Sequence, residues 1–349
     1  MGDPHQHDNA NDHPTPSCCA PSAPHEAPSK PQPAAAPNTT VSAPSRPTIA
    51  LPGGTFLMGT DYRDAFPFDG EGPIRPVSLS PFRIDTYPVT NRDFAAFVSA
   101  TNYLSESEHF QWSFVFWAHL PPDRLDELVE DTVAAAPWWC KVPGASWQYP
   151  EGPGSHINNR PNHPVVHVSW NDAVAYAAWA GKSLPTEAQW EYAARGGLEQ
   201  KLYPWGDELT PDELTPDGQP TGRIQHLCNI WQGEFPRIDT AEDGFSGACP
   251  VDSFPPNSFG LYSITGNVWE WCSDWFHNAF TAAKQHNPTG PATGQTKVMK
   301  GGSFLCHASY CNRYRVAART SNTPDSATSN IGFRCVQPIP HVYPLASWV

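Results

Sequence analysis

The sequence lacks any long hydrophobic run. No stretch approaches the about 18 consecutive apolar residues that a membrane-spanning helix needs. The opening residues, MGDPHQHDNANDHPTPSCC, have neither the basic start nor the apolar segment of a signal peptide. Basic blocks are also absent, and 21 Lys and Arg against 35 Asp and Glu give a formal net charge of -14. These absences argue against a nucleic acid or membrane partner and predict a cytoplasmic protein.

Several catalytic motifs are missing as well. The chain has no GxSxG nucleophile elbow, no glycine-rich phosphate loop of the Walker type and no HExxH pair. It also has no internal repeat of fixed period, which argues against a solenoid or a propeller. The sequence motifs therefore give no indication of hydrolase, nucleotide-binding or zinc-protease activity.

Proline and glycine, by contrast, are abundant. The chain has 40 Pro and 25 Gly in 349 residues, and both residue types interrupt helices and strands. The 14 Trp and 17 Phe supply enough apolar mass for a substantial core. We therefore expect an α/β (α+β) fold that is irregular and rich in loops. Residues 1–47 contain almost no large apolar side chains and predict a disordered tail, which leaves residues 48–349 as one folded domain.

Three helices are indicated by their caps and apolar spacing. Each predicted start has a Ser or Thr cap answered three residues later by Asp or Gln, as in a capping box. The expected segments are NRDFAAFVSAT after Thr90, the helix after Ser169 that stops near Gly181, and the helix after Thr186 that stops at Gly196. The segment from Thr48 to Thr60 resembles a hairpin around a Gly-Gly turn. After Gly197 no regular pattern is evident.

Two cysteines lie five residues apart in KGGSFLCHASYCNRYRVAAR, at Cys306 and Cys311. This spacing places them on opposite faces of a strand, and well over a quarter turn apart on a helix, so only a turn would bring them together. Buried thiols without a role, a structural disulfide, half a zinc site and a two-thiolate Cu(I) site all remain open. The missing export signal disfavours the disulfide, and the absence of a nearby CxxC or HxxxH disfavours zinc.

Two later segments, Cys228–Phe245 and Leu261–Trp275, combine Asn, Asp or Glu with glycine in turn-forming sequence. Such loops offer carboxylate, amide and backbone oxygens to a hard cation such as calcium, although most of them are simple turns. Neither has the spacing of an EF-hand.

The segment KGGSFLCHASYCNRYRVAARTSNTPDSATSNIGFRC, Lys300 to Cys335, resembles the signature of formylglycine-generating enzymes, or sulfatase-modifying factors. The similarity continues through the two later helix segments, NIWQGEFP, EDGF, FPPNSFGLY and GNVWEWCSDW, and so spans residues 48–337. It implies a C-type-lectin-like fold with little regular secondary structure. Secretory-pathway relatives have cysteines where this chain has Ala177, Ala194 and Val316, so the resemblance is to a bacterial-type enzyme in a reducing compartment.

The resemblance also implies an activity. Members of this family convert the cysteine of a CxPxR segment in an unfolded sulfatase to Cα-formylglycine, using dioxygen and a thiol reductant. By position, Cys306 and Cys311 would bind Cu(I), Ser303 would contact the substrate thiol or oxygen species, Trp269 would line the oxygen pocket, and Asn330 would lie along the peptide groove.

The resemblance further implies two calcium sites. One would use Asn229, Ile230, Asp243 and Phe245, and the other Gly266, Val268 and Glu270. In the second set Ser263 replaces an Asn ligand of some relatives, which puts that site in question. Two other functional classes share the fold: a non-catalytic sulfatase-binding paralogue, which usually lacks the cysteine pair, and a non-haem-iron sulfoxide synthase, whose His-rich site residues 1–47 do not supply.

Overall fold

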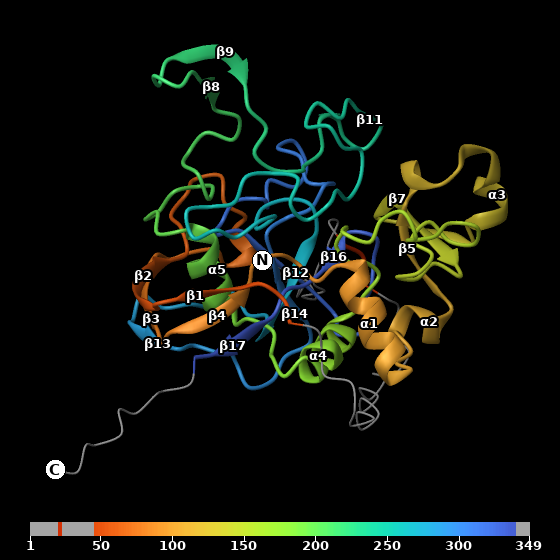
Figure 1. Ribbon diagram of the computed structural model, residues 1–349, viewed down its shortest axis with the longest axis horizontal. Helices are drawn as coiled ribbons and strands as arrows, with labels where there is room; N and C mark the ends of the chain where they lie inside the picture. The colour runs from red at the N-terminus through yellow and green to blue at the C-terminus, as the bar shows by residue number, and fades with distance from the viewer. Residues whose placement is uncertain (1–19, 23–44, 340–349) are drawn as a thin grey trace, which may run out of the picture.

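The computed structural model describes residues 20–22 and 45–339 of the chain. Short strands in several small sheets are joined by long irregular connections, and helices pack beside them (Figure 1). The helices are α1 (Asn91–Thr101), α2 (Glu106–Phe110), α3 (Leu125–Leu128), α4 (Trp170–Trp179) and α5 (Glu187–Arg195), with 3-10 turns η1 (Pro67–Asp69), η2 (Trp117–His119) and η3 (Pro122–Arg124). The expected loop-rich α/β fold is confirmed. In the ranges described, no helix is long and apolar enough to cross a membrane.

A four-stranded sheet lies at the centre of the molecule (Figure 1). Its order is β15 (Arg319–Asn322), β14 (Lys297–Lys300), β12 (Trp269–Trp275) and β16 (Ile331–Gly332), with β16 parallel to β12 and the other pairs antiparallel. The first four residues of β12 are all buried, so the sequence carries no alternation there. Strands therefore follow Gly197, where the sequence shows no regular pattern.

The remaining strands form smaller sheets around this centre. They are β1 (Thr48–Leu51), β4 (Phe82–Asp85) and β17 (Val336–Pro338); β13 (Gln285–His286), β3 (Arg75–Leu79) and β2 (Gly54–Met58); β5 (Trp112–Phe116), β7 (Ala136–Pro143) and β6 (Asp131–Val133); and the pairs β8 (Asp212–Leu214) with β9 (Pro220–Ile224) and β10 (Gly233–Glu234) with β11 (Ile238–Asp239). The predicted hairpin over Thr48–Thr60 was wrong, because β1 pairs with β4 while β2 pairs with β3. Gly53 sends the chain from one sheet to the other at φ 67°.

The predicted helix starts are confirmed by their hydrogen bonds. Thr90, Ser169 and Thr186 each cap a helix in a complete capping box. In each box the side chain three residues later, Asp93, Asp172 or Gln189, accepts a hydrogen bond from the backbone N–H of the cap. The sequence reading missed α2, although Ser105 and Glu108 form the same box. A helix of five residues has too few turns for its apolar spacing to be recognised.

Helices α1 and α4 meet through aromatic side chains. Phe94 and Phe97 are fully buried, and their rings lie 6.0 and 5.6 Å from the ring of Tyr176. Full burial of one such ring is worth about 1.5–3 kcal/mol. This contact secures the helices against the central sheet, since Tyr176 also touches Phe333 just beyond β16.

The folded part begins before residue 48. Arg46 forms an ion pair with Asp85 at 2.6 Å and a second with Asp93 at 3.1 Å. Ala20 and Pro21 are buried, and Ser22 hydrogen bonds to Asn322. The rest of the predicted tail lies outside the described residues.

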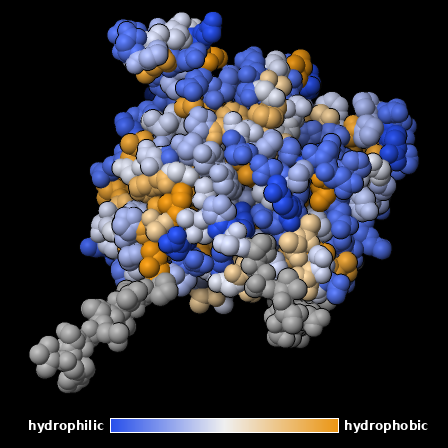
Figure 2. Space-filling model, viewed as in Figure 1, coloured by the Kyte–Doolittle hydropathy of each residue, from blue (hydrophilic) through white to orange (hydrophobic). Residues whose placement is uncertain are grey.

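The hairpin of β8 and β9 projects from the body of the molecule (Figure 1). Its surface is mostly hydrophilic in the space-filling view (Figure 2), although Leu214 and Ile224 are more than half exposed. This projection lies away from the central sheet, which carries the candidate site.

Candidate active site

The loop that holds the two cysteines begins directly after β14. Gly301 and Gly302 both have positive φ, 96° and 74°, where side chains are strained. A Cβ on Gly302 would also come within 2.9 Å of the Tyr314 Cα atom. The glycine pair therefore turns the chain sharply out of the sheet and into the segment that starts at Ser303.

A turn then brings the two thiols together. The Cys306 amide donates to the Ser303 carbonyl, and the Cys311 amide donates to the His307 carbonyl. The sulfur atoms of Cys306 and Cys311 lie 3.2 Å apart, well beyond the about 2.05 Å of a disulfide bond. The two residues do meet, and they meet through a turn, as the spacing requires of any approach; in the structure the pair is not a disulfide.

The thiols are buried, and burial governs their chemistry. Both side chains are 1% exposed and belong to the core cluster that also contains Trp269. Burial and the neighbouring Cys311 thiol raise the pKa of Cys306 well above its ordinary value. A thiolate at this position therefore requires a stabilising group, and a bound cation is the simplest such group.

Ser303 and Asn330 form a polar edge beside the thiols. The Asn330 amide nitrogen donates to Ser303 Oγ at 3.0 Å, and the Ser303 backbone N–H donates to Cys306 Sγ at 3.4 Å. Trp269 begins β12, is fully buried, and its indole N–H has no hydrogen-bond partner. Hydrogen bonds or sulfur contact thus link four of the five predicted site residues, which are Ser303, Cys306, Cys311 and Asn330. The fifth, Trp269, belongs to the same core cluster as the two cysteines.

Aromatic residues close the outer side of the thiol pair. A small cavity there is lined by Trp138, Phe235 and Tyr310 together with the cysteines. The rings of Phe235 and Tyr310 stack at 4.6 Å, and Trp138 meets Tyr310 edge-on at 5.1 Å. The sequence reading missed all three, because nothing local marks a tryptophan of β7 as close to a loop that follows β14.

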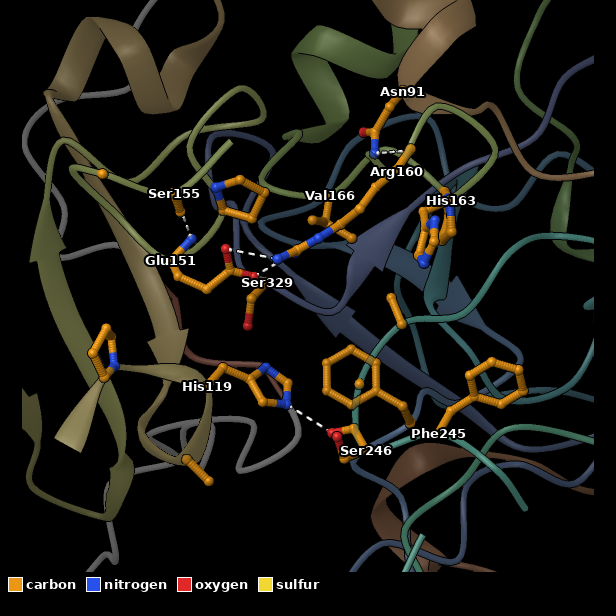
Figure 3. Close-up of a pocket in the computed structure, with 18 of the residues that line it drawn as sticks. Asn91, His119, Glu151, Ser155, Arg160, His163, Val166, Phe245, Ser246 and Ser329 are labelled. Carbon is orange, nitrogen blue, oxygen red and sulfur yellow. Dashed lines mark hydrogen bonds and ion pairs between the residues drawn. The ribbon is translucent and has the colours of Figure 1, made fainter. Parts of the chain in front are cut away.

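A larger cavity of about 670 Å³ lies behind the same loop (Figure 3). Ser303 and Leu305 line the thiol cavity, whereas Phe304 between them lines this one. Its polar side carries the ion pair of Arg160 with Glu151, and His119 is bonded to the Ser246 carbonyl, as the dashed lines in Figure 3 mark. The backbone of the loop therefore forms a thin wall between two cavities.

The donor set fits a soft monovalent metal. Two adjacent sulfurs in an apolar, aromatic environment suit Cu(I), which prefers thiolate ligands. Within the described ranges, no group of three or more His, Cys, Asp or Glu side chains is arranged to hold a metal ion. The residues present therefore fit a two-sulfur site better than a zinc site, which needs four ligands.

The first predicted calcium set is brought together by the fold. Asp243 accepts from the backbone N–H groups of Ile230 and Phe245, both at 3.0 Å. The Asn229 side-chain oxygen is buried and has no hydrogen-bond partner. A buried acceptor without a donor beside a carboxylate fits a hard cation.

The second predicted set fits a cation poorly. Gly266 lies beside Asn229 in an isolated bridge, so the loops of the two predicted sets adjoin. Both carboxylate oxygens of Glu270, however, accept from Arg334 at 2.7 Å, and one also accepts from the Trp190 indole. The set of Gly266, Val268 and Glu270 therefore lacks an uncommitted carboxylate.

Arginines of the segment Lys300–Cys335 form ion pairs that link distant parts of the chain. Arg315 pairs with Glu71 through two hydrogen bonds, and Arg319 pairs with Glu187 in the same way. Arg313 pairs with Asp69 at 2.5 Å. These bonds span more than 130 positions of sequence and hold the loops in place.

The chain matches the family model described as the sulfatase-modifying factor enzyme 1-like domain over residues 32–339. It belongs to that family.

Curated relatives are similar along most of their length. The chain is 61% identical over 291 residues to the formylglycine-generating enzyme of Thermomonospora curvata, covering 82% of this chain and 92% of the relative. It is 55% identical over 307 residues to the enzyme of that name from Streptomyces coelicolor, covering 88% and 92%. Among solved structures, PvdO from Pseudomonas aeruginosa matches with a TM-score of 0.60 and 25% identity over 87% of this chain and 99% of that one.

Proposed function

We propose that this protein oxidises the cysteine of a CxPxR segment in an unfolded sulfatase to Cα-formylglycine, with copper at Cys306 and Cys311, dioxygen as oxidant and a thiol as reductant. The observation that carries the proposal is the buried sulfur pair, 3.2 Å apart, beside the hydrogen-bonded Ser303 and Asn330. Similarity to proteins named formylglycine-generating enzyme supports the same activity.

The proposed reaction balances with one dioxygen and two reductant thiols. The substrate CH₂–SH group becomes an aldehyde and its sulfur leaves as hydrogen sulfide. One oxygen atom enters the aldehyde and the other becomes water, while the two reductant thiols become a disulfide. Copper, when bound, would supply the redox chemistry that the protein's own side chains lack.

The chain's own residues bind, orient and exclude water. Cys306 and Cys311 are already adjacent, so a soft ion gains its second sulfur without reorganisation of the loop. The Ser303 hydroxyl, fixed by Asn330, is oriented to contact a substrate group beside Cys306. Trp138, Phe235 and Tyr310 would cover the site and keep it apolar.

An extended peptide is the proposed form of the substrate, because the target cysteine must reach buried sulfurs before its own protein folds. The chain's net charge of -14 is compatible with attracting the peptide arginine. Replacing that arginine should therefore slow turnover far more than replacing either x residue. Equal effects of both replacements would contradict this mode of recognition.

The direct test is incubation of the protein with a CxPxR peptide, thiol, copper and air, followed by mass spectrometry. The expected product has lost the thiol and gained an aldehyde that an aminooxy reagent captures. A copper-loaded protein that leaves the peptide unchanged would reject the proposal. Full activity after removal of copper with a Cu(I)-specific chelator would reject the metal while retaining the enzyme.

A further inference from the structure

A cavity of about 490 Å³ is separate from the thiol cavity. It is lined by residues of β2, β3, β13, the start of α5 and the end of β12, and none of them lines the thiol cavity. Its walls include Met58, Arg75, Asp274 and Phe280. Small-molecule sites commonly measure about 300–1,000 Å³, so this cavity is large enough for a small organic ligand.

One buried arginine of this cavity has no counter-ion. Five arginines are buried in the part of the chain that the structure describes, and four of them pair with a glutamate: Arg195, Arg315, Arg319 and Arg334. The fifth, Arg75, is 2% exposed and forms no ion pair with any described residue. Its Nη1 atom donates to the Pro73 carbonyl at 3.2 Å, and its Nε–H has no hydrogen-bond partner. An arginine side chain stays charged, and a buried charge without a partner is unfavourable.

The surroundings of Arg75 leave its charge incompletely balanced. Burial lowers the pKa of Arg75, and the carboxylates of Glu191 and Glu187, which act to raise it, do not offset that effect. Both oxygens of Glu187 already accept from Arg319. The guanidinium carbon lies 3.7 Å from the centroid of the Phe280 ring, which covers one of its faces. A ligand in this cavity would therefore meet a positive charge beside an aromatic surface.

Asp274 also lines the cavity, and it offsets the charge of Arg75 only partly at neutral pH. One of its oxygens accepts from the Glu187 N–H at 2.9 Å and from the Ser273 hydroxyl at 3.1 Å. Burial and the neighbouring Glu187 raise the pKa of Asp274 to about 7, whereas Arg319 acts to lower it. Lys297 of β14 is a further charged neighbour. Below pH 7 the Asp274 carboxyl group is mostly protonated, and in that form it can donate a hydrogen bond to an anion.

We propose that this cavity binds a small organic carboxylate, with its charge on Arg75 and its apolar part against Phe280 and Met58. The planar fork of a guanidinium matches the two oxygens of a carboxylate, and carboxylates are the partners of the four other buried arginines. An organic ligand fits better than a bare oxyanion, because Phe280 and Met58 offer it apolar contact. The site is independent of the proposed cysteine oxidation, since no residue of the thiol cavity takes part.

Isothermal titration of the full-length protein at pH 6 compares three ligands that separate charge from shape. Benzoate has both a carboxylate and an apolar ring, and it should bind saturably with a Kd of about 1 mM or below. Benzamide keeps the ring without the charge and should bind at least about 10-fold more weakly. Inorganic sulfate keeps the charge without the ring and should also bind more weakly than benzoate.

Three results of this titration would count against the site. Absence of saturable benzoate binding would overturn the proposal. Equal affinities for benzoate and benzamide would overturn the role of the charge. Equal affinities for benzoate and sulfate would overturn the organic character of the ligand.

Two pairs of substitutions locate the binding site. Arg75→Gln should weaken benzoate binding at least about 10-fold, whereas Arg63→Gln, at a side chain that is 89% exposed, should leave it unchanged. Thr289→Glu keeps Arg75 and adds a carboxylate at the exposed rim of the cavity, so it should weaken binding by about 3- to 10-fold, while the neutral Thr289→Gln should not. Unchanged affinity in a folded Arg75→Gln, or in Thr289→Glu where Arg75→Gln does not fold, would place the binding elsewhere and reject the proposal.

Discussion

Two buried polar regions adjoin the central sheet, and the pKa of the buried group is lowered in one and raised in the other. In the first, Lys300 of β14 and Arg195 of α5 pair with Glu191, and they hold its pKa at about 2 although burial alone would raise it. In the second, six residues beyond Lys300, burial dominates and raises the pKa of Cys306. In the first, which we call the scaffold region, the charge of Glu191 is compensated within the protein, whereas a thiolate at Cys306 would need a stabilising group such as a soft cation.

The comparison is tested most strongly at the thiols. We expect Cys306→Ser and Cys311→Ser each to lower kcat/KM for a CxPxR peptide by at least about 1000-fold, equivalent to about 4 kcal/mol of transition-state stabilisation. A serine oxygen is a hard donor, so each variant should also lose tight Cu(I) binding in competition with a chelator.

Cys272→Ser is the matched control. Cys272 is a fully buried thiol of β12, and its pKa is also raised well above the ordinary value by burial. It packs in a different cluster, with Trp190 and Val298. Activity that fell equally in all three variants would mean that the loss reflects damage to the fold, and the special role of the pair would be rejected.

The scaffold region should respond in stability. Glu191→Ala leaves Arg195 buried without this partner, while Lys300 keeps its longer ion pair with Glu187 at 3.8 Å; breaking such a buried pair costs about 3–5 kcal/mol of unfolding free energy. Urea denaturation measures this loss. Glu127→Ala removes the exposed pair with Arg124 and should leave the curve unchanged. Similar midpoints for both variants would contradict the distinction between buried and exposed pairs.

Local signals in the sequence predicted some of these features and not others. The capping boxes at Thr90, Ser169 and Thr186 need only four consecutive residues, so the helix starts were predictable. The pairing of β1 with β4 was not, because a Gly-Gly turn permits a hairpin but does not select its partner strand. Strand choice depends on long-range packing that no local pattern encodes.

The candidate site shows the same division. Cys306 and Cys311 share one turn; the spacing alone left their approach open, and the resemblance indicated it. Trp138 and Phe235 reach that turn from β7 and the β10–β11 turn, and only the assembled fold reveals them. The binding of Ala20 by Asn322 joins positions 302 residues apart and was equally invisible to local reasoning.

The pH dependence of stability separates the scaffold further. Because the folded pKa of Glu191 lies near 2, below the 4.5 of an unfolded glutamate, its contribution is present above pH 4.5 and is lost as pH falls towards 2. The full contribution is about 3 kcal/mol. The test is therefore to measure the unfolding free energy by urea denaturation at pH 5.5 and at pH 3.5. Its decrease between the two pH values should be larger for the wild type than for Glu191→Gln. Equal losses would mean that Glu191 does not titrate as the ion pairs imply.

Calcium at the first loop is the smallest expected effect. Burial raises the pKa of Asp243, and the Asn229 side-chain oxygen beside it is buried without a partner, so a bound cation would stabilise both groups. A site filled at 100 times its dissociation constant adds about 2.7 kcal/mol of stability. We therefore expect chelation to lower the Tm of the wild type and calcium to restore it.

Asp243→Asn should remove this calcium response, because it deletes the charge and keeps the shape. Glu242→Gln changes the exposed neighbouring carboxylate and should retain it. If chelator leaves the wild-type Tm unchanged, and Asp243→Asn melts at that same temperature, the loop holds no calcium. The unpartnered oxygen of Asn229 would then need another donor, such as an ordered water, and the loop would resemble the ion-paired scaffold in being complete without a ligand.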